Sequence, residues 1–167
     1  MGFQSTVRQF QTDGIVGDIV INGPCRGQTG VLKTSDPTQN VIGRALTHVS
    51  GQDKQFVAGG TGVFAGILAN SKEYALQGTA AGGALAPTIT LPNELTVDAI
   101  TMTAGIVVSL AGAGNISDQV EFVQATGALN AIAPGASASA GSTIIPRARV
   151  VRNNVPSAGL AIIELTV

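Results

Sequence analysis

The sequence contains unusually few charged residues. Of 167 residues, 9 are Lys or Arg and 10 are Asp or Glu, which gives 11% charged residues and a net charge of −1. Soluble domains typically carry about 25% charged residues. Without a basic excess the chain lacks the electrostatic field that nucleic-acid binders use, so we expect no nucleic-acid partner. Hydrophobic residues make up 44% of the chain, and this fraction argues against intrinsic disorder.

Long hydrophobic runs are also absent. No stretch approaches the ~18 consecutive apolar residues of a transmembrane helix, so we expect no membrane partner. Residues 1–14 are polar and rich in glutamine, and they have no apolar core of the kind found in secretory signals. We therefore expect synthesis in a reducing cytoplasm, which also suits a chain with a single cysteine.

The residues that most enzymes and metal sites need are scarce. The sequence has one cysteine, Cys25, one histidine, His48, and no tryptophan. One His and one Cys cannot build a zinc site, and no motif links the two as a nucleophile and its base. The acids Asp36, Asp53 and Asp118 are isolated in turn-like stretches. We therefore predict a protein that is not an enzyme, with no catalytic, metal-binding or cofactor-binding residues and no cofactor.

Glycine, in contrast, is abundant, with 22 residues spread along the chain. Because each glycine inside a helix costs about 1 kcal/mol, this distribution disfavours long helices. Short β-prone runs lie between Gly, Pro and Asn turns, at a spacing typical of barrels and sandwiches. We predict an all-β fold, either a single small β-barrel or a jelly-roll-like β-sandwich. The predicted strands cover residues 15–21, 30–34, 41–49, 55–58, 62–69, 88–91, 95–103, 105–110, 115–123, 127–132, 143–151 and 160–167.

Three local signals are sharper than the rest. Gly66, inside a β-prone run, predicts a bulge or a close approach of the backbone. Residues 115–132 predict a β-hairpin, with Phe122 on its apolar face and Glu121 on the opposite face. Residues 134–141, which are mostly Ala, Ser and Gly, predict a flexible loop.

The beginning of the chain differs from the remainder. We predict an extended N-terminal arm over residues 1–13, followed by a core domain over residues 14–167. Phe3, Val7 and Phe10 stand among polar residues of the arm, which holds two of the five phenylalanines of the chain. Two interpretations stay open. The arm is either a frayed terminus or a segment that docks on a neighbouring subunit, in which case Phe3, Val7 and Phe10 bind the partner.

Three arginines form a cluster of charge near the end of the chain. Arg147 and Arg149 project to the same face of a predicted strand, because they are two positions apart, and Arg152 follows them. The cluster is either a solvated strand face or a partner-binding patch that pairs with carboxylates. Three arginines without stacking aromatics between them are too few for nucleic acid.

Several runs together resemble a known family, the capsid decoration or structural cement proteins of tailed bacteriophages. These runs are Gly14-Ile-Val-Gly-Asp-Ile-Val, Asn40-Val-Ile-Gly-Arg-Ala, Gly59-Gly-Thr-Gly-Val-Phe-Ala-Gly-Ile-Leu, and Asn115-Ile-Ser-Asp-Gln-Val-Glu-Phe with the later Thr126-Gly-Ala-Leu. They are turn-and-strand patterns rather than catalytic signatures, and they extend over most of the chain after the arm. Ser117 departs from the pattern, because a glycine often precedes the Asp in this family.

The resemblance implies a structural virion protein, made in the host bacterial cytoplasm, that binds the outer surface of a phage capsid. It implies contact with the major capsid protein at junctions between subunits, stabilisation of the shell, and self-association as a homodimer or homotrimer. One alternative remains open: a carbohydrate- or surface-binding β module of a phage head fibre or a lectin-like protein. The absence of Trp and the single Tyr argue against this alternative, because glycan sites usually have aromatic walls.

Overall fold

The computed structural model describes residues 14–70 and 90–166, and within them the chain is almost entirely β-structure. These residues form nine strands and one short 3-10 turn: β1 (Arg26–Leu32), η1 (Pro37–Gln39), β2 (Ala45–His48), β3 (Gln55–Ala58), β4 (Phe64–Leu68), β5 (Thr96–Leu110), β6 (Gln119–Val123), β7 (Leu129–Ile132), β8 (Ser142–Arg152) and β9 (Gly159–Leu165). The predicted all-β class is confirmed. In the described part of the chain, no helix has the length and apolar character needed to cross a membrane.

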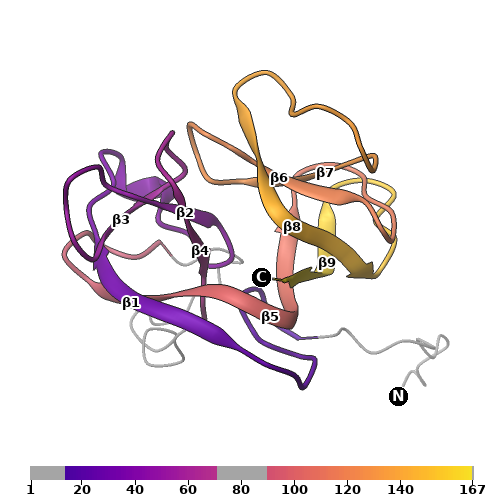
Figure 1. Cartoon of the computed structure of the whole chain (residues 1–167), viewed down its shortest axis with the longest axis horizontal. Helices are drawn as coiled ribbons and strands as arrows, with labels where there is room; N and C mark the ends of the chain where they lie inside the picture. Colours follow the sequence, from indigo (N-terminus) through magenta and orange to yellow (C-terminus); the bar gives the residue numbers. More distant parts are fainter. Residues whose placement is uncertain (1–13, 71–89, 167) are drawn as a thin grey trace, which may run out of the picture.

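The strand pairings close into two rings that share one strand. In the first ring β1, β3, β2, β4 and β5 pair in that order, and β5 returns to β1. In the second ring β5, β7, β6, β8 and β9 pair in that order, and β9 returns to β5. The 15 residues of β5 give the strand a contour length of about 50 Å at 3.3 Å per residue, so one half can serve each ring. Figure 1 shows β5 running out of the indigo and purple strands and turning into the orange and yellow ones.

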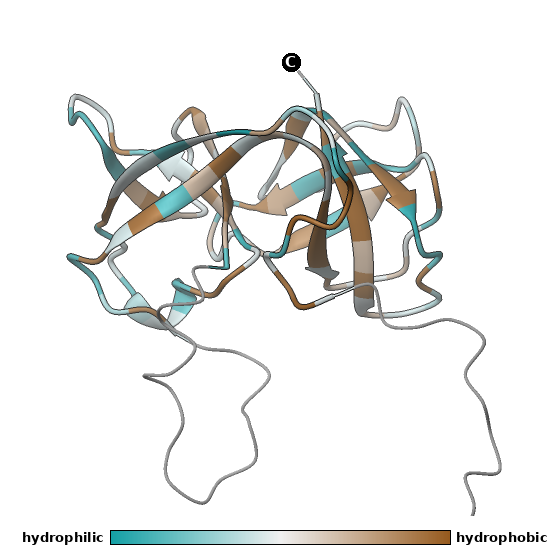
Figure 2. Cartoon of the chain, turned by 90° about the horizontal axis from the view of Figure 1, so that it is seen from below, coloured by the Kyte–Doolittle hydropathy of each residue, from teal (hydrophilic) through white to brown (hydrophobic). Residues whose placement is uncertain are grey.

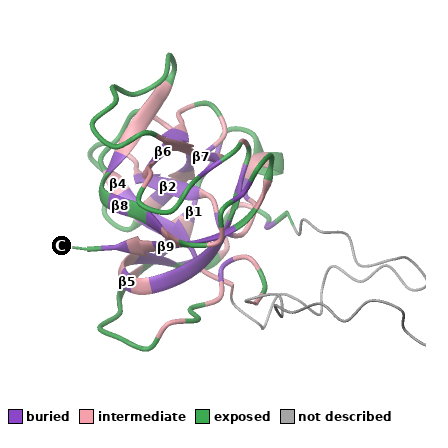
Figure 3. Ribbon diagram, turned by 90° about the vertical axis from the view of Figure 1, so that its right-hand side faces the viewer, coloured by how far each residue is buried: buried purple, intermediate pink, exposed green. Residues whose placement is uncertain are grey.

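The buried hydrophobic residues form two clusters, and the alternation along β5 contributes to both. Val97 and Ala99 belong to the first-ring cluster with Phe56. Ile100 lies on the opposite face of β5, because successive strand residues alternate, and packs in the second cluster with Phe122. The second cluster also includes Ala45 of β2 and Ile67 of β4, so it extends between the rings. Figure 2 shows hydrophobic and hydrophilic residues alternating along the strands, and Figure 3 shows buried residues concentrated on the strands and exposed residues in the loops.

The two rings touch a second time where two glycine turns meet. The Ala45 amide donates to the Gly127 carbonyl (2.9 Å), and the Gly60 amide donates to the Gln124 carbonyl (2.6 Å). Gly59 and Gly127 have positive φ values of +70° and +71°, and a Cβ atom on Gly59 would lie 2.7 Å from the Gly127 nitrogen. Glycine alone tolerates both the conformation and the approach, so backbone contact fixes this junction.

The predicted strand at residues 15–21 is wrong. Gly14 and Gly17 have positive φ values of +123° and +87°, and left-handed residues interrupt an extended strand. The segment forms a turn instead and keeps only an isolated antiparallel bridge between Ile19 and Ile106 of β5. Its hydrophobic alternation therefore reflects a loop that lies along β5, not a strand of its own.

Other local predictions are confirmed. The run at residues 55–58 is β3. Gly66 lies where the register between β2 and β4 shifts, and a Cβ atom on Gly66 would lie 2.8 Å from the Ile100 carbonyl oxygen. Gly66 therefore lies at a bulge, and its backbone also lies close to the backbone of Ile100 in β5. β6 and β7 form the predicted hairpin, in which Phe122 pairs with Leu129.

Candidate functional site

The arginine cluster of β8 divides into a pair and a separate residue. Arg147 and Arg149 are exposed on either side of buried Ala148, so both project from the outer face of the second ring, as their spacing predicts. They border one shallow hollow, which Arg152 does not border. Arg152 lies at the end of β8, beyond a register shift that follows Val150.

Arg149 is paired within the chain. It stands opposite Glu164 in the ladder between β8 and β9, and its Nε donates to Glu164 Oε1. The Arg149 side chain is 61% exposed, and exposed ion pairs contribute only about 0–1 kcal/mol to stability. The pair matters more for charge, because Glu164 offsets the charge of Arg149, whereas Arg147 has no ion pair with any residue that the structure describes.

Arg147 has an unusual backbone conformation. Its φ is +54°, in the left-handed region that costs a non-glycine residue about 1–2 kcal/mol. The end of β9 holds this conformation, because the backbone amide and the hydroxyl of Thr166 both donate to the Arg147 carbonyl at 3.2 Å. As a result Pro146 and Arg147 are exposed in succession. Backbone strain of this kind is concentrated at functional sites.

A second hollow lies beside Arg147, between the two rings, and we call it the junction groove. It has a volume of about 470 Å³ and is bordered by Arg26, Val63, Phe64, Thr101, Pro146, Arg147, Leu165 and Thr166. Val63 is 77% exposed, and the partly buried ring of Phe64 lies 6.3 Å from that of Phe122. The junction groove thus combines apolar surface with two arginines.

The segment after the predicted arm exposes large apolar side chains. Ile15, Ile19 and Val20 are 67%, 45% and 37% exposed, and clustered exposed apolar residues mark contact surfaces. The arm itself, residues 1–13, lies outside the described residues, so its separation from the core at 14–167 stays a prediction. The three arm residues that are predicted to bind a partner also lie outside the described residues; they are Phe3, Val7 and Phe10.

The single histidine and the single cysteine lie in different settings. His48 lies on β2, where its Nε2 is 3.1 Å from the Gln28 amide nitrogen and its ring meets the Phe56 ring edge-on at 5.3 Å. His48 is thus a satisfied strand residue. Cys25 is exposed in the loop before β1. Within residues 14–70 and 90–166, no group of three His, Cys, Asp or Glu side chains is placed to hold a metal ion.

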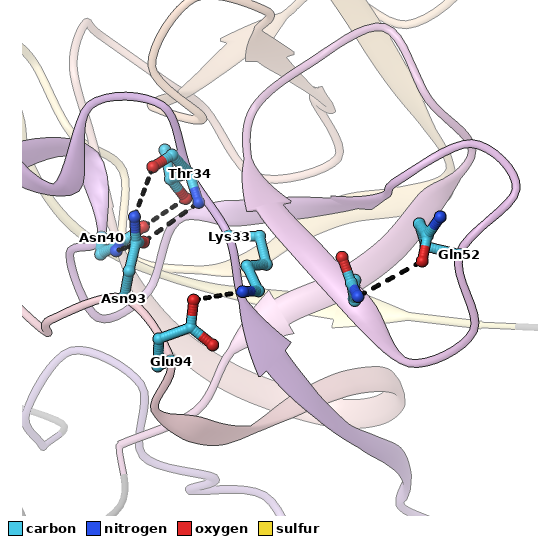
Figure 4. A network of polar contacts seen from close by, with 7 residues as sticks. Lys33, Thr34, Asn40, Gln52, Asn93 and Glu94 are labelled. Atoms are coloured by element: carbon cyan, nitrogen blue, oxygen red, sulfur yellow. Dashed lines mark hydrogen bonds and ion pairs between the residues drawn. The ribbon is translucent and has the colours of Figure 1, made fainter.

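A buried polar network fixes the loop between β1 and β2 (Figure 4). The Thr34 hydroxyl donates to Asn40 Oδ1 and accepts from the Ala58 amide at 3.0 Å. Asn40 Nδ2 donates to the Leu91 carbonyl at 3.1 Å and to Asn93 Oδ1 at 2.9 Å. Because buried polar groups are costly without partners, this network serves the fold rather than an external ligand.

Two ionisable groups in the same region have shifted pKa values. Hydrogen bonds from the Thr38 hydroxyl, and then from the Gln39 amide, lower the pKa of Asp36. Burial lowers the pKa of Arg44. Arg44 Nη1 donates to the Thr126 carbonyl in the β6–β7 turn at 3.0 Å, so its side chain adds a further link between the two rings.

The environment of Glu121 does not follow from the strand pattern. The alternation in β6 places Glu121 on the face opposite Phe122, yet Glu121 is only 1% exposed. The amide of Ser139, in the loop between β7 and β8, donates to Glu121 Oε2 at 2.8 Å. A buried carboxylate requires such a partner. The sequence of this Ala- and Ser-rich loop predicts flexibility, and its backbone also provides a hydrogen bond to the buried carboxyl group of Glu121.

Fold and surface together define a class of protein. The described residues form a small all-β molecule whose prominent features are shallow hollows, arginines and exposed aliphatic side chains, which are features of proteins that assemble through surface contacts. A chain in a solved structure entitled "The capsid of Myoviridae Phage XM1" has the same fold, with a TM-score of 0.61 and 16% sequence identity over 99% of this chain and 98% of that chain. At this identity the likeness shows the fold alone.

The sequence itself then identifies the family. The family model described as "Structural cement protein (E217 gp24/Pam3 gp6)" matches residues 3–166, so the chain belongs to the phage structural cement proteins. It is a structural virion protein with a capsid decoration role, which confirms the resemblance seen in the turn-and-strand motifs. Among curated proteins, no relative matches the sequence.

Proposed function

We propose that this protein binds the outer surface of the assembled capsid, at junctions between major capsid subunits, and braces the shell against the pressure of the packaged genome. The observation that carries the proposal is the match to the cement family over residues 3–166. The low charge of the chain, 11%, supports it, because neighbouring copies can pack with little like-charge repulsion. The proposed role is not enzymatic and involves neither nucleic acid nor membrane.

The predicted arm supplies the first contact surface in this proposal. Phe3, Val7 and Phe10 act as anchors on a neighbouring subunit, and the arm leads directly into exposed Ile15 and Ile19. An extended segment can add a strand to the edge of a neighbouring sheet, where main-chain hydrogen bonds give affinity and side chains give specificity. The arm and this apolar segment would then form one continuous contact.

The arginine face of β8 supplies the second contact surface, through Arg147, Arg149 and Arg152. Their guanidinium groups suit the carboxylates of a partner protein. Self-association as a homodimer or homotrimer would present two or three copies of each surface at once. Because linked contacts bind with an effective concentration set by geometry, modest individual contacts then give strong attachment to the shell.

Binding to purified shells tests the proposal. Expanded capsids that lack the protein would be mixed with it, and bound copies would be counted by cosedimentation and electron microscopy, with free capsid subunits as the comparison. We expect saturable binding to expanded shells, weaker binding to free subunits, and the mass of a dimer or trimer in light scattering. A monomer that does not bind expanded shells would refute the proposal.

Deletion of residues 1–12 tests the role of the arm. We expect lower occupancy on the shell or loss of self-association, with unchanged circular dichroism and thermal midpoint, because the first described strand begins at Arg26. A double variant, Phe3→Ala with Phe10→Ala, keeps the length of the arm and removes only the anchors. If the deletion variant reaches wild-type occupancy and self-associates normally, the arm is not a contact surface.

A further inference from the structure

Arg26 and Arg147 approach the junction groove from different rings. Arg26 is the first residue of β1, Arg147 lies in β8, and both border the groove together with Phe64 and Leu165. The sequence groups Arg147 with the next arginines along β8. The fold instead pairs it with an arginine from the other end of the chain, so the groove has a cation on each of its two walls.

Neither guanidinium is satisfied within the described part of the molecule. Among residues 14–70 and 90–166, the side chains of Arg26 and Arg147 form no hydrogen bond or ion pair, and the ion pairs found there involve Lys33 and Arg149. Of the residues that the structure describes, no Asp or Glu borders the groove. In a chain of net charge −1, this is a local excess of positive charge that calls for an anionic partner.

The groove also offers apolar surface and a fixed wall. Val63 is largely exposed and Phe64 partly buried, so an apolar side chain can pack there beside the arginines. Thr166 holds the carbonyl of Arg147, which sets the direction of that wall. A volume of about 470 Å³ suits a short extended segment rather than a folded domain.

We propose that the junction groove binds an extended acidic segment of the major capsid protein. An Asp or Glu carboxylate of that segment lies between Arg26 and Arg147, and a neighbouring apolar side chain packs on Val63 and Phe64. The inference rests on the proposed capsid-binding function and specifies the chemistry of the partner. Arginine binds carboxylates through paired hydrogen bonds. A nucleic acid fits less well, because it requires a longer basic track with stacking aromatics.

Charge reversal tests the groove. The variants R26E, R147E and the double variant would be titrated onto expanded shells, with K54E as the matched control. Lys54 is exposed, has the same φ of +54° as Arg147, and does not border the groove. We expect each single variant to bind at least tenfold more weakly, the double variant about a hundredfold more weakly, and K54E within twofold of wild type. Added salt should weaken the wild type more than the double variant.

Cross-linking identifies the occupant. The variants R26K and R147K keep the charge and introduce a primary amine, which a carbodiimide joins to a nearby carboxylate through an amide bond, with release of the corresponding urea. We expect mass spectrometry to find each introduced amine joined to an Asp or Glu of the major capsid protein. These cross-links should be missing from the wild type, because guanidinium groups do not react in this way.

The outcomes separate this inference from the proposed function. Failure of the wild type to bind shells would refute the proposed function itself. If the wild type binds and the folded variants R26E and R147E bind as tightly as K54E, the function stands and the groove inference is wrong. Cross-links from the introduced amines to a second copy of this chain would assign the groove to self-assembly and overturn the capsid segment as its occupant.

Discussion

The contact between the two rings can be tested at a single glycine. Gly59 lies where the turn after β3 meets the β6–β7 turn, with φ at +70°. In the variant Gly59→Ala, the new Cβ atom would collide with the Gln124 carbonyl oxygen and lie 2.7 Å from the Gly127 nitrogen. Both atoms belong to backbone, so no side-chain rotation can relieve the collision. The two turns must separate.

The expected loss of stability has two parts. Alanine in the left-handed region costs about 1–2 kcal/mol. Separation of the turns weakens two hydrogen bonds between the rings, Gly60 to Gln124 and Ala45 to Gly127, at about 1 kcal/mol each. Together the free energy of unfolding should fall by about 3–4 kcal/mol. At roughly 2–4 °C per kcal/mol for a chain of this size, the thermal midpoint should fall by about 6–16 °C.

Gly51→Ala is the matched control for this variant. Gly51 has nearly the same φ, +72°, but no atom of the described residues lies within 4 Å of the position that its Cβ would occupy. The control therefore suffers only the conformational cost of about 1–2 kcal/mol. Urea unfolding of both variants, followed by circular dichroism, measures the difference, which should be about 2 kcal/mol, the sum for the two weakened hydrogen bonds. Equal destabilisation of the two variants would refute a close backbone contact between the rings.

Two further predictions concern the loop between β1 and β2. Asn40→Ala leaves the Thr34 hydroxyl and the Leu91 carbonyl without their buried partner, so urea unfolding should show a loss of about 2–4 kcal/mol; an unchanged midpoint would contradict the network. The pKa of Asp36 lies below its unfolded value, mainly through the Thr38 hydroxyl. The stabilisation that ionised Asp36 gives the folded state is therefore present above about pH 3.9 and is lost as the pH falls through the folded pKa. The stability difference between wild type and Asp36→Asn should shrink on acidification, and a constant difference would contradict this.

Local features of the fold could be predicted from the sequence because they depend on neighbouring residues. The β-prone run at 55–58 became β3 without change, since turns bound it on both sides. Gly66 signalled a bulge because a glycine weakens a strand interior and usually stands where the backbone bends or meets another segment closely. The register shift between β2 and β4 confirms it. The hairpin of β6 and β7 followed from alternation around a short turn.

Long-range features could not be predicted in this way. The sequence pattern predicts two strands, at 95–103 and 105–110, that are interrupted at Ala104. The structure instead has the single strand β5, which pairs with β1 near its start and with β9 near its end. Such pairings join segments far apart in the chain, and no local periodicity encodes them. The same limit applied to the candidate site. Nothing near Arg147 in the sequence indicates that Glu164 takes Arg149 as its partner or that Arg26 lies at the same groove.

The shared strand explains why the glycine contact and the junction groove belong together. Two rings joined only along β5 could pivot about that strand, and the walls of the groove would then move relative to each other. The contact of Gly59 with the β6–β7 turn, and the bond from Arg44 to Thr126, oppose that movement. Paired recognition of one carboxylate by Arg26 and Arg147 requires a fixed geometry. A protein that binds a shell in many copies gains when every contact is identical, so a rigid junction suits the cement role better than a flexible one.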